Sequence, residues 1–116
     1  MRFHIERKEA KLEIIIHARH LDTTETIRDY VNKKASKITK YDNRINKIQF
    51  TLKIEGQNHI VESICSVART TLVAEASNSD MYAAIDLVMS KLEKQFIRQK
   101  EKMKQHKGIK KGETAE

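Results

Sequence analysis

Four segments of the chain have patterns of hydrophobic and polar residues that indicate β-strands. The first segment, residues 11–18, is rich in β-branched apolar residues. A strict alternation over residues 48–54 is typical of a half-buried strand. The sequence Glu55-Gly56-Gln57-Asn58 is a hairpin turn signal. Two more strands are therefore expected after it, over residues 60–67 and 72–76.

Two other segments repeat apolar residues at helical spacing. The stripe of the first consists of Ile27, Val31, Ala35 and Ile38. Either Asp22 or Thr24 could cap its start. The second helix follows a capping-box pattern that ends at Asp80. Its stripe thins after Phe96, so its last turns are expected to project into solvent before Lys107-Gly108 ends it.

The order β-α-β-β-β-α predicts an α+β fold. Three consecutive strands joined by short turns form an antiparallel meander, and the first strand, which arrives through a helix, can pair in parallel. A four-stranded sheet with two helices packed on one face is the economical arrangement. We expect one domain over residues 1–106, with an N-terminal extension at 1–10 and a flexible basic tail at 107–116.

Composition favours a cytoplasmic protein. Of the 116 residues, 39% are hydrophobic and 34% are charged, which fits a folded domain. No apolar run approaches the roughly 18 to 20 residues that span a bilayer, so no membrane partner is expected. The N-terminus lacks the apolar region of a signal peptide. Cys65 is the single cysteine, which excludes an internal disulfide and indicates a small core residue.

The net charge of +7 is concentrated in two segments. Residues 28–40 hold five basic residues and one acidic residue, and residues 91–111 hold nine and two. These segments therefore carry +11, and the remainder of the chain carries −4. Such segregation indicates a surface for a polyanion. The alternative is a solvated helix face, although such a face usually mixes both signs.

Helical spacing places the basic residues of each helix on one flank. The flank on the first helix consists of Lys33, Lys37 and Lys40, and that on the second consists of Lys91, Lys94, Arg98 and Lys102. A ridge of this kind suits a phosphate backbone. Lys34 points into the apolar stripe of its helix, where it either snorkels to the edge or contacts phosphate between the helices.

Nothing in the sequence supports catalysis. The five histidines are scattered without metal-ligand spacing, and there is no Gly-rich phosphate loop. Asp80 fits a cap, and it does not face Asp86. We expect no enzyme activity, no metal, no cofactor and no small-molecule substrate. Aromatic residues are too few for a base-stacking platform, which favours recognition of RNA shape and backbone.

The sequence Asp80-Met81-Tyr82-Ala83-Ala84-Ile85-Asp86, followed by Lys91-Leu92-Glu93-Lys94-Gln95, resembles the signature of the ribosome hibernation-promoting factor family, which includes the ribosome-associated inhibitor A proteins. The segments Ile27-Arg28-Asp29-Tyr30-Val31 and Ile38-Thr39-Lys40-Tyr41 resemble the first-helix pattern of that family. The resemblance covers about residues 12 to 102.

This resemblance implies a fold similar to double-stranded RNA-binding domains and a specific function. Family members bind the small ribosomal subunit in the mRNA/tRNA decoding channel and silence translation under stress or in stationary phase. The implied partners are the small subunit, through its 16S-type rRNA, and the 70S ribosome, with a monomer off the ribosome. The implied rRNA contacts are Lys33, Lys34, Lys37, Lys40, Lys91, Lys94, Arg98 and Lys102. The roles of Asp80 and Tyr82 stay open between structure and contact.

Three features depart from the family pattern. About ten extra residues precede the first strand, Ala18 replaces a usual glycine, and the C-terminal domain of the long form is absent from this sequence. The sequence is thus either a short form or the N-terminal domain of a long form. Whether the protein promotes or opposes ribosome dimers therefore stays open. Two alternatives also stay open: a general binder of double-stranded or structured RNA without ribosome preference, and a protein-interaction module whose basic helix docks on an acidic partner or a membrane surface.

Overall fold

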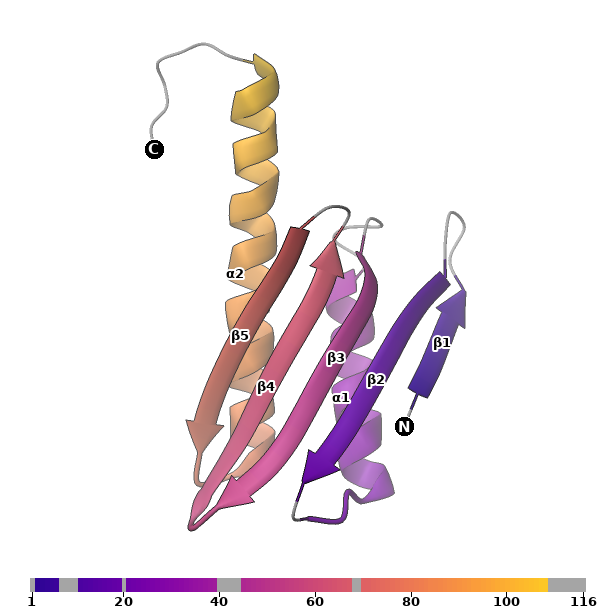
Figure 1. Cartoon of the computed structure of the whole chain (residues 1–116), viewed down its shortest axis with the longest axis vertical. Helices are drawn as coiled ribbons and strands as arrows, with labels where there is room; N and C mark the ends of the chain where they lie inside the picture. The colour runs from indigo at the N-terminus through magenta and orange to yellow at the C-terminus, as the bar shows by residue number, and fades with distance from the viewer. Residues whose placement is uncertain (1, 7–10, 20, 40–44, 68–69, 109–116) are drawn as a thin grey trace.

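The computed structural model describes residues 2–6, 11–19, 21–39, 45–67 and 70–108. Its elements in chain order are β1 (Arg2–Glu6), β2 (Lys11–Arg19), α1 (Glu25–Thr39), β3 (Ile45–Glu55), β4 (Asn58–Val67), β5 (Thr70–Asn78) and α2 (Met81–Gly108). The strands form one sheet in the order β1-β2-β3-β4-β5. Both helices lie on the same face of this sheet (Figure 1).

The predicted α+β fold is confirmed: the segment β2-α1-β3-β4-β5-α2 has the β-α-β-β-β-α order, with four strands and two helices on one face. The strands β3, β4 and β5 form the antiparallel meander. The strand β2 pairs in parallel with β3, from Glu13↔Lys47 to Arg19↔Lys53. This parallel pairing follows from the crossover through α1, which returns the chain to the same end of the sheet.

The N-terminal extension adds a fifth strand, which the sequence analysis did not predict. The strand β1 pairs antiparallel with the first half of β2, from Glu6↔Lys11 to Arg2↔Ile15. In this register Phe3 lies opposite Ile14, and Ile5 lies opposite Leu12. The main chain of β1 therefore covers part of the edge that β2 would otherwise expose.

The predicted hairpin turn between β3 and β4 is confirmed. The register ends at Glu55↔Asn58, so Gly56 and Gln57 alone form the turn. Gly56 has φ +62°, in the left-handed region that residues with a Cβ rarely adopt. This local signal, unlike the pairing of β1, is contained within four consecutive residues.

A single apolar cluster fills the space between the sheet and the helices. Phe50 of β3, Cys65 of β4, Val31 of α1 and Phe96 of α2 all belong to it and are almost fully buried. The predicted burial of Cys65 is therefore confirmed. The cluster ends at Phe96, and the adjacent Ile97 is 53% exposed. Beyond this point α2 runs past the end of the sheet (Figure 1), as the thinning of its stripe predicted.

Side-chain caps begin both helices. The Ile27 amide donates to the Thr24 hydroxyl at 3.1 Å, so Thr24, and not the exposed Asp22, caps α1. At α2 the Ala83 amide donates to the Asp80 carboxylate at 3.1 Å. The predicted capping role of Asp80 is confirmed, but the predicted capping box is wrong, because Asp80 precedes the helix and its amide donates to Asn78 Oδ1 at 3.0 Å rather than to Ser77. Within the described ranges, neither helix is both long and apolar enough to cross a membrane.

Candidate nucleic-acid interface

The cations of α1 differ in how they are held. Lys33 and Lys37 are exposed, and within the described part of the chain neither makes a hydrogen bond or an ion pair. Lys34 is 34% exposed, and its ammonium lies 3.7 Å from the Asp86 carboxylate of α2. The same ammonium lies 5.3 Å from the centre of the Tyr30 ring, within the range of a cation–π contact. Lys34 is therefore engaged inside the molecule.

Tyr30, Tyr82 and Asp86 link the two helices. The Tyr30 hydroxyl donates a 2.7 Å hydrogen bond to Asp86 Oδ1. The Tyr30 and Tyr82 rings meet edge to face, with 5.0 Å between their centres and 87° between their planes. The hydrogen bond to Asp86, followed by burial and the nearby negative charge, raises the pKa of Tyr30 above its ordinary value. Tyr82, whose role the sequence left open, thus has a structural contact.

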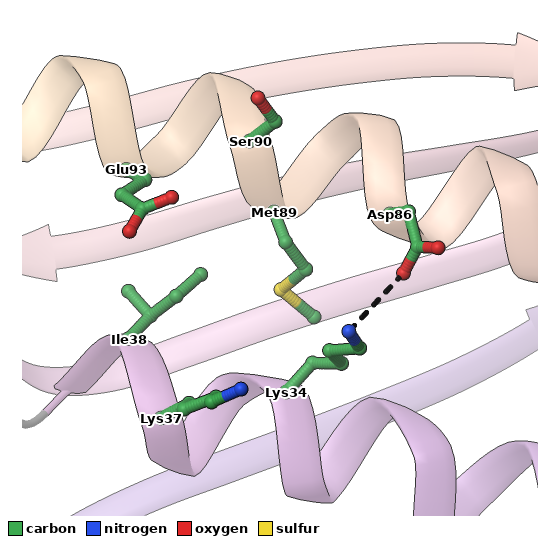
Figure 2. Close-up of a pocket in the computed structure, with 7 residues that line it drawn as sticks. All are labelled: Lys34, Lys37, Ile38, Asp86, Met89, Ser90 and Glu93. Carbon is green, nitrogen blue, oxygen red and sulfur yellow. Dashed lines mark ion pairs between the residues drawn. The ribbon is translucent and has the colours of Figure 1, made fainter.

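A cleft of about 250 Å³ separates α1 from α2. Figure 2 shows the side chains that line it, which are Lys34, Lys37, Ile38, Asp86, Met89, Ser90 and Glu93. The α1 wall is basic, the α2 wall carries two acids, and the floor is apolar. The α2 flank that faces α1 is therefore acidic and does not extend the basic surface of α1.

The basic residues of α2 lie on its other side, toward β5. The Lys91 ammonium donates a 2.6 Å hydrogen bond to the main-chain carbonyl of Glu75. Gln95 Nε2 donates to the carbonyl of Val73 at 2.8 Å. Arg98 lines a shallow hollow together with Leu72 and Gln95. Lys91 and Gln95 therefore bind the outer edge of the last strand in the sheet.

The predicted contact residues thus divide into two groups. Lys34 and Lys37 line the cleft on the α1 side, and Lys91 and Arg98 lie along β5. Lys94 is exposed on α2. Lys40, the side chain of Lys102 and residues 109–116 of the expected 107–116 tail lie outside the described residues, whereas residues 107–108 belong to α2. The acidic α2 wall of the cleft consequently separates the basic flank of α1 from Lys91 and Arg98 of α2.

Asp86 and Tyr30 are the site residues that the sequence analysis missed. It concluded correctly that Asp86 does not face Asp80, but it assigned Asp86 no partner. Tyr30 appeared only within the segment Ile27-Arg28-Asp29-Tyr30-Val31 and was assigned no contact. The two residues are 56 positions apart, so no local spacing could reveal their hydrogen bond. The only available signal was an acid within the helix-two motif.

The open face of the sheet has a different character. Lys53 lies 3.0 Å from Glu62 and 3.9 Å from Glu55, and the bond to Glu62 raises the pKa of Lys53. Ile64 and Val73 lie opposite each other on β4 and β5 and are 46% and 60% exposed. This face therefore mixes both signs with apolar groups. No group of His, Cys, Asp and Glu within the described ranges could hold a metal ion.

Comparisons with known proteins place this geometry in context. The family model described as "Sigma 54 modulation protein / S30EA ribosomal protein" matches residues 14–104. A ribosome hibernation promoting factor from Azotobacter vinelandii is 37% identical over 91 residues, which are 78% of this chain and 85% of that protein. The Salmonella typhimurium protein of the same name is 37% identical over 95 residues, which are 82% of this chain and 100% of that protein. The structure of a ribosomal subunit interface protein from Coxiella burnetii aligns with a TM-score of 0.72 and 29% identity, over 75% of this chain and 96% of that one.

Proposed function

The chain belongs to the Sigma 54 modulation protein / S30EA ribosomal protein family, and from this membership we propose that it is a ribosome-associated translation inhibitor that acts in hibernation. It is a homologue of proteins named ribosome hibernation promoting factor. The family consists of non-catalytic ribosome-binding factors. We propose that the chain binds the small ribosomal subunit in the mRNA/tRNA decoding channel, alone or within the 70S ribosome, under stress or in stationary phase. We place this action in the cytoplasm, and we propose that the protein is a monomer when it is not bound to the ribosome.

The observation that carries the proposal is the family match over residues 14–104, which includes both basic helices. The cations best placed for 16S-type rRNA are Lys33, Lys37, Lys94 and Arg98, because all four are exposed. Within the described residues none of the four makes a hydrogen bond or an ion pair, so each can approach a phosphate without breaking an internal contact. Each neutralised phosphate releases counterions, so binding should weaken as salt rises.

The four other predicted contacts also belong to the proposed rRNA surface, but they differ in how accessible they are. Lys40 and Lys102 continue the helical spacing of the two flanks. Lys34 and Lys91 are occupied by Asp86 and by the Glu75 carbonyl. Ribosomal RNA therefore reaches these two lysines only if it takes their ammonium groups from internal partners.

A sucrose gradient of ribosomes with and without the protein tests the proposal. We expect the wild-type chain to sediment with small subunits and 70S particles at low salt and to inhibit translation in vitro. The double charge reversal K37E/K94E should lose this binding. The matched control R19E/K47E makes the same charge change on the open face, because these positions alternate with the buried residues of β2 and β3, and it should keep binding.

If K37E/K94E sedimented with ribosomes as well as the wild type does, the proposed surface would be contradicted. Equal affinity of the wild type for a plain RNA duplex and for small subunits would contradict the ribosomal preference and favour a general binder of structured RNA. The same gradient separates ribosome dimers, so it also decides whether the chain promotes or opposes them.

A further inference from the structure

We propose that Asp86 is a specificity-determining residue. It holds the Lys34 ammonium in the α1–α2 cleft and thereby weakens the binding of RNA whose phosphates do not match the basic surface. This inference rests on the proposed function, because it concerns how the same basic surface discriminates among RNAs. It gives the acid at the end of the helix-two motif a role that a positively charged binding surface does not by itself require.

Lys34 makes two contacts, one with Asp86 and one with the Tyr30 ring. Its ammonium lies 3.7 Å from Asp86 and 5.3 Å above the Tyr30 ring (Figure 2 marks the ion pair). Asp86 also accepts the 2.7 Å hydrogen bond of the Tyr30 hydroxyl, and so fixes the ring on which Lys34 lies. Asp86 therefore acts on Lys34 both directly and through Tyr30.

The edge contact of Tyr82 adds to this restraint. The Tyr82 ring lies 5.0 Å from the Tyr30 ring and one helical turn before Asp86 on α2. Tyr30 is thus held from α2 at both its ring and its hydroxyl. The position of Lys34 consequently depends on the packing of the two helices and not on a single flexible ion pair.

The cleft also opposes a phosphate that approaches Lys34. Such a phosphate must come close to the Asp86 carboxylate, and Glu93 adds a second negative charge on the same α2 wall. The negative charges of the phosphate and of these two carboxylates repel each other. Lys33 and Lys37 of the same helix have no such partner within the described residues. One helix therefore presents available cations beside a withheld one.

The modest strength of the restraint is what makes it selective. Lys34 and Asp86 are 34% and 50% exposed, and exposed ion pairs of this kind are weak. A partner that presents several phosphates in the right positions can break the pair, whereas an RNA with few matched phosphates leaves it closed. While the pair is closed, an unmatched RNA gains nothing from Lys34, whereas a matched partner gains the Lys34 contact less the small cost of opening the pair, and specificity is this difference of affinities.

The variant D86N tests this role, because asparagine keeps the shape and can still accept the Tyr30 hydrogen bond. The probe is a plain RNA duplex, and the dissociation constant is measured at several salt concentrations. One more phosphate contact should tighten duplex binding about threefold and steepen the slope of log K against log salt by about 0.7 to 0.9. Adding K34M to D86N should abolish the gain.

The control D29N removes the same charge from an exposed acid on α1. An equal gain in D29N, a gain that survives in K34M/D86N, or weaker duplex binding by D86N would each overturn the inference. Circular dichroism and thermal melting establish that every variant is folded. Failure of the wild type to sediment with small subunits would instead refute the proposed function, and the duplex measurements would still decide the role of Asp86.

Discussion

The Lys91 ammonium donates a 2.6 Å hydrogen bond to the main-chain carbonyl of Glu75, which ties α2 to the outer edge of β5. One turn later Gln95 binds the carbonyl of Val73 in the same way. The β5 residues involved are two apart, and alternate residues of an edge strand direct their carbonyls outward. Side chains four apart on a helix match this spacing. Two polar residues of α2 therefore satisfy a strand edge that could otherwise pair with another chain.

Removal of both groups in K91A/Q95A should destabilise the protein by about 1 to 3 kcal/mol, since each lost hydrogen bond contributes about 0.5 to 1.5 kcal/mol. Urea unfolding measures this loss. Sedimentation at rising protein concentration should also reveal self-association, because the edge of β5 is left open. The control K94A changes an exposed lysine on the same helix and should stay within about 0.5 kcal/mol of wild type. Equal stability of K91A/Q95A and K94A would contradict the capping role.

Thr24→Ala should cost about 1 kcal/mol, because it removes the hydroxyl that accepts the Ile27 amide at the start of α1. Asp22→Ala tests the other cap that the sequence allowed. Asp22 is exposed, so its replacement should change the unfolding free energy by no more than about 0.5 kcal/mol. Thermal unfolding of both variants makes the comparison. A larger loss in Asp22→Ala would show that the wrong residue has been identified as the cap.

Tyr30 should ionise at higher pH than a free tyrosine, because Asp86 accepts its proton in a hydrogen bond and disfavours the phenolate. The pKa is higher in the folded than in the unfolded state, so the stabilisation is complete below the unfolded pKa and is lost as pH rises through the folded pKa. Ultraviolet titration of wild type and Y30F identifies the Tyr30 transition by difference. In D86N the carboxylate charge is lost although the amide oxygen can still accept the hydrogen bond, so this transition should move to lower pH, and an unchanged midpoint would argue against the contact between the Asp86 carboxylate and Tyr30.

Phe96→Ala should destabilise the protein by about 3 to 5 kcal/mol, because Phe96 is 2% exposed and its loss leaves a cavity at the end of the core. Ile97→Ala alters the next residue, which is 53% exposed, and should cost less than about 1 kcal/mol. Chemical denaturation of both variants tests which side of α2 faces the core near its last buried residue. Similar losses of unfolding free energy in both variants would mean that this orientation of α2 is wrong.

The number and order of the predicted strands and helices followed from local patterns. Alternation over residues 48–54 and the left-handed Gly56 of the next turn each depend on a few consecutive residues, so the chain itself carries the signal. The strand β1 was missed although Phe3 and Ile5 alternate with polar neighbours. Five residues are too few for a confident pattern, and β1 becomes a strand only by pairing with β2.

The candidate site was predicted less completely than the fold. Helical spacing correctly placed Lys33, Lys37 and Lys94 away from the core. It could not tell which flank of α2 faces α1 and which faces β5, because this depends on how the helices pack on the sheet. Lys91 therefore looked equivalent to the other lysines of its flank, and the distinct position of Lys34 in the apolar stripe did not reveal its partner Asp86.

The sequence by itself determined six of the seven described elements, their order and the concentration of positive charge in two helices, since these depend on periodicity and composition among neighbouring residues. Only the tertiary structure decided the fifth strand, the division of the basic residues between the cleft and the edge of β5, and the link from Tyr30 to Asp86. Those relationships join residues far apart in the chain, and they arise from burial of a common core that brings separate helix and strand surfaces into contact.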